Sequence, residues 1–178
     1  MIILMGLAGS GKSTQGQKLA AATGRVWLSA GQILRESGQF DEILNSGNLV
    51  DDMLTVEIMA HAMAGVVREG KNLILDGFPR DAKQASWMAD NIAEVIEQII
   101  LINVPKDELL RRLKARGRAD DTEEVILQRF KITEQNMGEI SRILGAKGIP
   151  TVMIDGTGTP DEVFARLANT IADNHNAV

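Results

Sequence analysis

The chain has 178 residues, a length typical of one domain. It contains no cysteine, which excludes disulfides, thiolate zinc sites and cysteine nucleophiles, so we expect no zinc. The net charge of −5 and the 3% of aromatic residues argue against a nucleic-acid-binding surface, which would be basic and would offer stacking platforms. An anionic ligand must therefore be held by a local cluster of cations.

The apolar start of the chain, residues 1–5, lacks a basic region before it and runs directly into Gly6. This pattern predicts a buried strand and not a signal peptide. No stretch approaches the roughly 20 apolar residues that a membrane span requires. We therefore expect a cytoplasmic protein without a membrane segment, and the lack of cysteine fits a reducing compartment.

Short apolar runs then alternate with longer helical patterns. The runs lack polar alternation, as buried parallel strands do, and they occupy Ile2–Met5, Val26–Leu28, Leu73–Leu75, Ile99–Val104 and Thr151–Ile154. Helical patterns occupy Ser13–Thr23, Leu49–Glu69, Lys106–Ala115, a segment that Asp121 would cap, and a segment after Pro160. This alternation predicts an α/β fold with a parallel sheet between two layers of helices. Two polar, glycine-containing segments, residues 30–50 and 116–121, are predicted inserts at the carboxyl edge of the sheet.

The segment Gly6–Ser13 reads GLAGSGKS and matches the phosphate-loop pattern G-x-x-x-x-G-K-[ST]. Its glycines allow backbone N–H groups to turn toward phosphate oxygens, and the helix that follows directs its positive end at the same anion. The pattern assigns Lys12 to the β- and γ-phosphates and the hydroxyl of Ser13 or Thr14 to Mg²⁺. A plain glycine-rich turn is the alternative, but the loop lies between an apolar run and a helical pattern, as a phosphate loop requires.

A carboxylate, Asp76, ends the apolar run at 73–75, where P-loop enzymes place an acid that holds Mg²⁺, often through water. Several arginines then follow at spacings that let them converge: Arg80, Arg112, Arg116, Arg118 and Arg129. Arginine binds phosphate oxygens in pairs of hydrogen bonds and stays charged. Solvated helix charges paired with nearby carboxylates are the alternative for any single arginine, and we favour it for Arg111 and Arg142.

Five motifs together resemble the adenylate kinases and their UMP/CMP kinase relatives. They are the phosphate loop, LSAGQILR at 28–35, GNLV at 47–50, DGFPR at 76–80 and RGRADD at 116–121. The resemblance covers nearly the whole chain, and DGFPR and RGRADD are far more specific than the loop alone. It implies a P-loop NTPase fold, three-layered, with a five-stranded parallel sheet in one domain spanning residues 1–178. Within that domain the core comprises 1–29, 51–115 and 122–178, with an acceptor-binding insert at 30–50 and a very short lid at 116–121.

The resemblance also implies the roles of particular residues. The catalytic cations would be Lys12, Arg80, Arg116, Arg118 and Arg129. ATP would be bound by Gly9, Ser10, Gly11, Lys12, Ser13, Thr14, Arg112 and Arg116, with Arg112 packed on the adenine. AMP would be bound by Ala30, Arg35, Val50, Gly77, Arg80, Gln84, Arg118 and Arg129. Mg²⁺ would be held by Ser13, Thr14 and Asp76, partly through water.

The predicted activity is reversible transfer of the ATP γ-phosphate to AMP, by a protein that acts as a monomer. Two residues point in different directions on the acceptor base. Ala30 is typical of UMP/CMP kinases, whereas Gln84 matches the amide of AMP enzymes. A UMP/CMP or broad-specificity kinase is therefore one alternative, and a nucleotide-binding module without turnover is another. A kinase of a small metabolite is disfavoured by DGFPR.

Overall fold

The computed structural model describes residues 1–118 and 121–175, with side chains described as far as residue 172. Its strands are β1 (Ile2–Met5), β2 (Val26–Ser29), β3 (Leu73–Asp76), β4 (Gln98–Asn103) and β5 (Thr151–Asp155). Its helices are α1 (Lys12–Thr23), α2 (Ala30–Glu36), α3 (Asp41–Asn45), α4 (Asp52–Arg68), α5 (Ala82–Asn91), α6 (Lys106–Arg116), α7 (Glu123–Gly145) and α8 (Pro160–His175), with a 3₁₀ turn at Ala93–Val95. No helix among the described residues is both long and apolar enough to span a bilayer.

Within the described residues, five strands form one parallel sheet in the order β2-β3-β1-β4-β5. The predicted α/β class and five-stranded parallel sheet are therefore confirmed. Strand β1 lies between β3 and β4, and its Leu4 pairs with Asp76 at the end of β3. Since the strands are parallel, the loops after β1 and β3 leave the same edge of the sheet, where open α/β sheets bind ligands.

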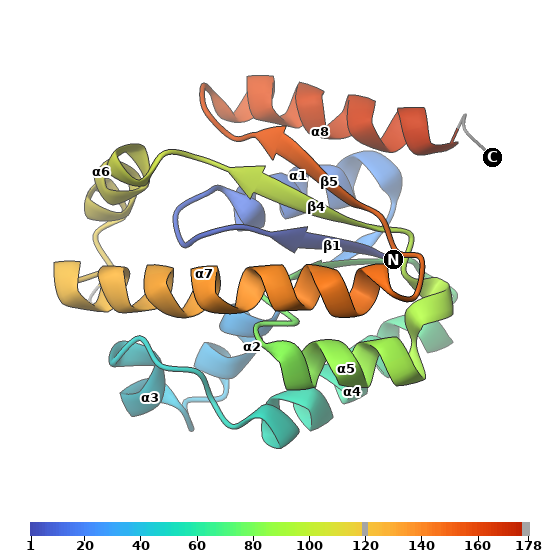
Figure 1. Cartoon of the computed structure of the whole chain (residues 1–178), viewed down its shortest axis with the longest axis horizontal. Helices are drawn as coiled ribbons and strands as arrows, with labels where there is room; N and C mark the ends of the chain where they lie inside the picture. Colours follow the sequence, from blue (N-terminus) through green and yellow to red (C-terminus); the bar gives the residue numbers. More distant parts are fainter. Residues whose placement is uncertain (119–120, 176–178) are drawn as a thin grey trace.

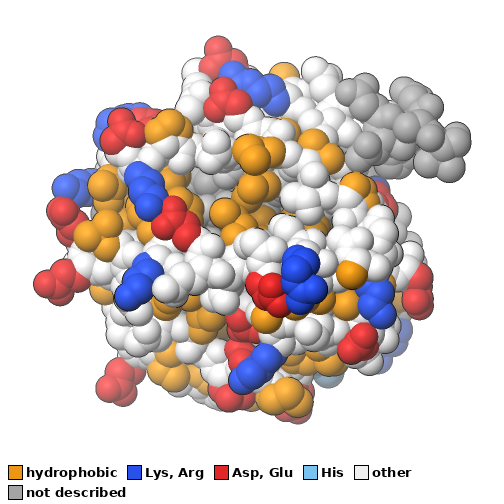
Figure 2. Space-filling view, viewed as in Figure 1, with side chains coloured by type: hydrophobic (Ala, Val, Ile, Leu, Met, Phe, Trp, Pro, Cys, Tyr) orange, Lys and Arg blue, Asp and Glu red, His pale blue; other side chains and the backbone are white. Residues whose placement is uncertain are grey.

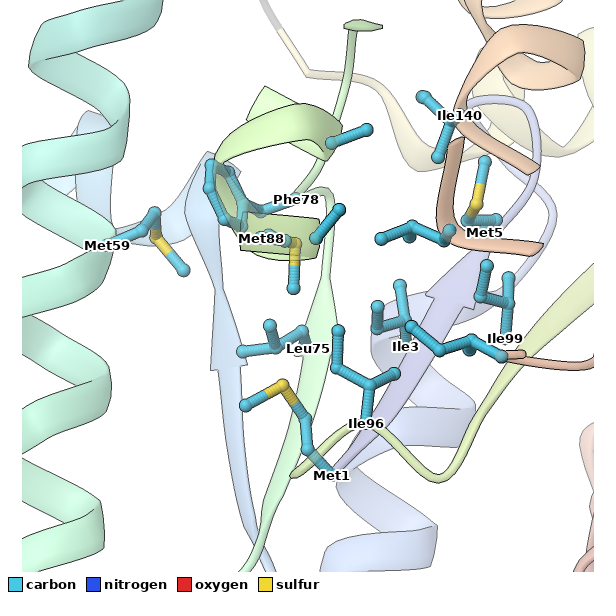
Figure 3. Close-up of a cluster of buried hydrophobic side chains, with 14 of the residues drawn as sticks. Met1, Ile3, Met5, Met59, Leu75, Phe78, Met88, Ile96, Ile99 and Ile140 are labelled. Atoms are coloured by element: carbon cyan, nitrogen blue, oxygen red, sulfur yellow. The ribbon is translucent and has the colours of Figure 1, made fainter. Parts of the chain in front are cut away.

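Helices cover both faces of this sheet, with α4, α5 and α7 on one side and α1 and α8 on the other (Figure 1). Alternate strand residues supply the two cores: Ile3 packs with α4, α5 and α7, whereas Ile2 and Leu4 pack with α1 and α8. Figure 3 shows Met59 of α4, Met88 of α5 and Ile140 of α7 in the buried cluster that also contains Ile3 and Leu75 of the sheet. Burial on both faces explains why the strand segments read as continuous apolar runs.

The helix boundaries depart from the sequence expectation at two caps. Helix α4 begins at Asp52 and not at residue 49, because the Asp51 side chain accepts a hydrogen bond from the Leu54 N–H. Helix α7 is capped by Thr122 and not by Asp121, as the Thr122 hydroxyl accepts from the Val125 N–H. The prediction for Asp121 was wrong because its carboxylate is already bound by two arginines. Helix α5 is a further element that the sequence analysis did not anticipate.

The predicted insert, residues 30–50, contains α2 and α3 and packs around a small apolar cluster of Leu34, Phe40, Leu44 and Val50. It also contacts α7, because the Arg129 guanidinium donates to the Leu44 carbonyl at 2.9 Å. A side chain at Gly47 would lie 3.0 Å from the Val125 carbonyl, so the insert approaches the first turns of α7 closely. Residues 119–120 of the predicted lid lie outside the described residues.

Candidate active site

The phosphate loop connects β1 to α1 and ends at Gly11, whose φ of 95° lies in the left-handed region that favours glycine. No side chain caps the start of α1, and no acidic residue lies in its first turn. The N–H groups and positive end of the helix are thus available to an anion. Gly9 is required for a second reason: an added side chain would lie 2.9 Å from Leu113 and 3.2 Å from the Leu109 carbonyl of α6.

The Lys12 ammonium lies across this loop. It donates to the Gly6 carbonyl at 2.8 Å and to the Leu7 carbonyl at 2.9 Å. Burial lowers the pKa of Lys12 from its ordinary value; the Asp76 carboxylate opposes this effect, and the cations of Arg80 and Arg116 add to it. These contacts hold the ammonium beside the loop. The oxygens of an incoming phosphate would replace the two carbonyl oxygens as its hydrogen-bond acceptors.

Ser13 and Asp76 meet beside the lysine, as the Ser13 hydroxyl donates to the Asp76 carboxylate at 2.6 Å. Asp76 is only 3% exposed. Among residues 1–118 and 121–175, no cluster of three His, Cys, Asp or Glu side chains forms a metal site of its own. Two adjacent hard oxygen donors suit Mg²⁺, which usually keeps water and substrate phosphate oxygens as its other ligands.

A cavity of about 630 Å³ opens over the phosphate loop and has the size of a nucleotide-binding site. Most of the predicted site residues line it: Gly9, Ser10, Gly11, Lys12, Ser13, Thr14, Arg35, Asp76, Gly77, Arg80, Arg112, Arg116, Arg118 and Arg129. On the outer face shown in Figure 2, by contrast, charged side chains of both signs are interspersed. The arginines that the sequence scatters over 95 positions are thus gathered at one cavity.

At one wall of the cavity Arg35 and Arg80 face each other across Gly31. The Arg35 guanidinium donates to the Gly31 carbonyl at 2.9 Å, and Arg80 Nε donates to the Gly77 carbonyl at 2.8 Å. A side chain added at Gly31 would lie 3.1 Å from the Arg80 guanidinium and 3.2 Å from that of Arg35. Burial lowers the pKa of Arg80; the Asp76 carboxylate opposes this, and the nearby cations of Arg35 and Arg129 add to it. Cations that crowd together in this way favour an anion between them.

Toward the predicted lid, Arg116 and Arg129 share the buried carboxylate of Asp121. Arg116 binds it through two nitrogens at 2.8 and 2.6 Å, and Arg129 lies 3.3 Å from it. The Asp121 side chain is only 2% exposed. Since Arg129 also donates to Leu44, one guanidinium links α7, the lid and the insert.

The far end of the cavity is formed by Arg112 and the loop between β5 and α8. Arg112 donates to the Glu108 carboxylate at 2.8 Å and to the Gly156 carbonyl at 3.1 Å. The two hydrogen bonds engage the edge of the Arg112 guanidinium. Its flat face is left for stacking against a nucleotide base. Glu108, Gly156 and Gly158 line the cavity here, and the sequence analysis did not identify them. Glycines of this kind carry no side-chain signal that could have revealed them.

Three predicted acceptor-site residues do not line the cavity: Ala30, Val50 and Gln84 are 0%, 4% and 1% exposed. The Gln84 amide is engaged by neighbours. Its oxygen accepts from the Arg80 N–H at 2.8 Å, and its nitrogen lies 3.4 Å from the Asp52 carboxylate. The predicted contacts of these three residues with an acceptor base stay predictions.

The phosphate loop and the arginine-lined cavity at the carboxyl edge of a parallel sheet define a P-loop phosphotransferase. A protein-family model described as adenylate kinase matches residues 4–149. The chain therefore belongs to the adenylate kinase family.

Curated relatives agree with this assignment. The adenylate kinase of Mycolicibacterium paratuberculosis (strain ATCC BAA-968 / K-10) is 38% identical over 176 residues, which cover 93% of this chain and 95% of that protein. The adenylate kinase of Mycobacterium sp. (strain MCS) is 37% identical over 182 residues, with coverage of 96% and 98%. An adenylate kinase of Thermus thermophilus is 33% identical over 181 residues, with coverage of 93% and 94%. Similarity thus extends over nearly the full length of each protein.

Proposed function

We propose that this chain transfers the γ-phosphoryl group of Mg-ATP to the phosphate of AMP, giving two ADP, and that the cations around the cavity carry the reaction. The observation that carries the proposal is the convergence of Lys12, Asp76 and the arginines on one cavity, together with membership in the adenylate kinase family. A non-catalytic nucleotide-binding module would not need cations from five separate segments.

Phosphoryl transfer spreads negative charge over the equatorial oxygens of the moving group, so that positioning and cationic stabilisation do most of the work. In our proposal Lys12 and the first turn of α1 bind the β- and γ-phosphates of ATP. Arg35 and Arg80 bind the acceptor's phosphate. No general base is required, because that phosphate already carries a negative charge.

Magnesium would be held by Ser13 and Asp76, with Thr14 as a further hydroxyl, and would neutralise charge on the ATP phosphates when bound. The chain's own residues hold the two nucleotides in line and keep water out. The links of Arg129 to Asp121 and Leu44 support a role in joining the covers on the two sides of the cavity. Such closure prevents hydrolysis of ATP.

The test is an initial-rate comparison with Mg-ATP and five acceptors in parallel: AMP, UMP, CMP, GMP and dTMP. We expect a strong preference for AMP. Comparable or better rates with UMP and CMP would favour the pyrimidine kinase that Ala30 suggested. ATP binding without transfer to any acceptor would contradict the proposed function.

We further propose that the chain acts as a monomer, as the resemblance implies, and that it is located in the cytoplasm, as the lack of cysteine led us to expect. Light scattering on the purified protein tests the first. A mass near twice 19.3 kDa would contradict it. Cell fractionation tests the second.

A further inference from the structure

Two carboxyl groups meet where α4 and α5 begin, behind the acceptor side of the cavity. Asp81 is the N-cap of α5, and its Oδ1 accepts a hydrogen bond from the Gln84 N–H at 2.9 Å. Its other oxygen, Oδ2, is buried, and no donor among the described residues reaches it. A buried carboxylate oxygen without a donor is costly, whereas a protonated one can itself donate.

The partner for such a proton is Asp52, the first residue of α4. The two side chains lie within hydrogen-bonding reach of each other, and this contact raises the pKa of Asp81 and lowers that of Asp52, which favours Asp81 as the donor. The Asp52 Oδ2 lies 3.2 Å from the ammonium of Lys83, whose side chain is 82% exposed. Two carboxyl groups within hydrogen-bonding reach can share one proton, because repulsion opposes the ionisation of both.

This carboxyl pair connects to the acceptor side through Gln84. The Asp52 Oδ1 lies 3.4 Å from the Gln84 amide nitrogen, and the Gln84 amide oxygen accepts from the Arg80 N–H. Because Asp52 faces the nitrogen end of the amide, it fixes which end points toward Arg80. The chain of contacts thus runs from Asp81 and Asp52 through Gln84 to the backbone of Arg80.

We propose that Asp52 and Asp81 are positioning residues that share one proton and thereby hold Gln84 and Arg80 for the acceptor nucleotide, so that acceptor affinity weakens when the proton is lost. This role in acceptor binding rests on the proposed function. Loss of the proton sets two negative charges against each other and pushes the start of α5 away from α4. The Gln84 amide nitrogen then loses its contact with Asp52, and the hydrogen bond from the Arg80 N–H to the Gln84 amide oxygen weakens.

Charges around the pair agree with this arrangement. Burial, followed by the hydrogen bond and negative charge of Asp52, raises the pKa of Asp81 from the ordinary value of 3.8 to about 6, although the backbone N–H groups of Gln84 and Lys83 oppose the rise. The hydrogen bond from Asp81 lowers the pKa of Asp52. Among the described residues, the charged group that faces Asp81 is Asp52 of α4, which also pairs with the Lys83 ammonium of α5. Helix α7 packs on α5 through apolar residues such as Ile140 and Leu144.

The variant Asp81→Asn tests the proposal, since an asparagine still caps the helix and donates to Asp52 at every pH. The wild-type protein takes up a proton on folding between pH 3.8 and about 6, so its stability relative to the variant must fall as pH rises through that window and then level off. Urea unfolding of both proteins from pH 4 to 8 measures this difference. Asp90→Asn, which removes a 70% exposed carboxylate from the same helix, is the matched control and should show no such trend.

Acceptor affinity is measured in parallel as the AMP dissociation constant by calorimetry and as KM for AMP. The phosphate of AMP itself titrates near pH 6, so the wild-type value is divided by that of Asp81→Asn, which removes this common effect. We expect the ratio to rise about 2- to 10-fold between pH 5 and 7.5, the worth of one net hydrogen bond. KM for Mg-ATP should give a ratio that does not change with pH.

Each outcome decides a separate point. A flat stability difference overturns the shared proton. A stability difference that changes while both AMP ratios stay flat overturns the positioning role. If no monophosphate accepts phosphate from the wild-type protein, the proposed function fails, yet the stability measurement and the AMP calorimetry still decide the carboxyl pair.

Discussion

Arg80 offers the sharpest test of the acceptor-phosphate site. We consider Arg80→Met, which keeps the length of the side chain and removes its charge and donors. The Arg80 Nε donates a hydrogen bond to the Gly77 carbonyl, and a terminal nitrogen of the guanidinium lies near Gly31, on the side of Arg35. A phosphate bound there would receive two charge-assisted hydrogen bonds from Arg80.

The loss can be estimated from those two bonds. At about 1.5 to 3 kcal/mol each they sum to about 3 to 6 kcal/mol. Since each 1.4 kcal/mol is a factor of ten, kcat/KM for AMP should fall about 10²- to 10⁴-fold. The neighbouring cations of Arg35 and Arg129 would still bind the phosphate in the variant, so we expect a fall in kcat/KM near the lower end of this range. The fold loses only the hydrogen bond to Gly77, worth about 1 kcal/mol.

The assay is the initial rate of ADP formation with AMP varied at saturating Mg-ATP, with circular dichroism to establish that the variant is folded. The matched control is Arg142→Met on α7, where the side chain is 68% exposed and pairs with Glu139 at 2.7 Å. We expect the control to retain wild-type kinetics. A folded Arg80→Met variant within tenfold of the wild-type kcat/KM would refute the assignment.

Three other predictions follow from the same contacts. Lys12→Ala should lower kcat by at least about 100-fold with the fold intact, because it removes the cation at the β- and γ-phosphates; near-wild-type turnover would remove Lys12 from the mechanism. Gly31→Ala should raise KM for AMP several-fold, as its methyl group crowds the two acceptor-side arginines, while KM for ATP stays unchanged; an equal change in both constants would contradict this. Burial alone would raise the pKa of Glu97, but hydrogen bonds from Arg25 and the N-terminal ammonium lower it to about 2. Glu97 should therefore add stability above its ordinary pKa of 4.5 that is lost as pH falls toward 2, and Glu97→Gln should flatten this part of the stability profile measured by urea unfolding.

Local sequence features predicted that the phosphate loop and Asp76 lie beside each other. The phosphate loop and Asp76 each follow an apolar run, and parallel strands end at the same edge of a sheet. The structure pairs Leu4 with Asp76 and joins Ser13 to Asp76, so the two segments lie side by side as expected, while their roles toward ATP and Mg²⁺ stay predictions. A feature that depends on adjacent residues of one motif can therefore be predicted from the sequence.

Contacts between segments far apart in the sequence were harder to predict. The spacing of Asp121 and Glu124 is typical of a helix cap, but Arg116 and Arg129 capture Asp121 and leave the cap to Thr122. An N-cap offers the carboxylate neutral backbone N–H groups, whereas the two guanidinium groups offer donors that also carry a positive charge. Rules for helix caps consider only residues close in sequence, so they do not include competition from arginines for the Asp121 carboxylate.

The sequence by itself determined the alternation of strands and helices, the phosphate loop and the family, because these depend on residue type and short spacing. Only the tertiary structure decided that Gly31 lies between two arginines, that the Gly156 carbonyl accepts a hydrogen bond from Arg112, and that Asp52 meets Asp81. Those encounters join segments that are 29 or more residues apart in most cases, and they exist because the order of strands in the sheet and the packing of helices on it bring the segments together. The proposed donor side of the site thus depends mostly on local motifs, whereas the proposed acceptor side is assembled by the fold.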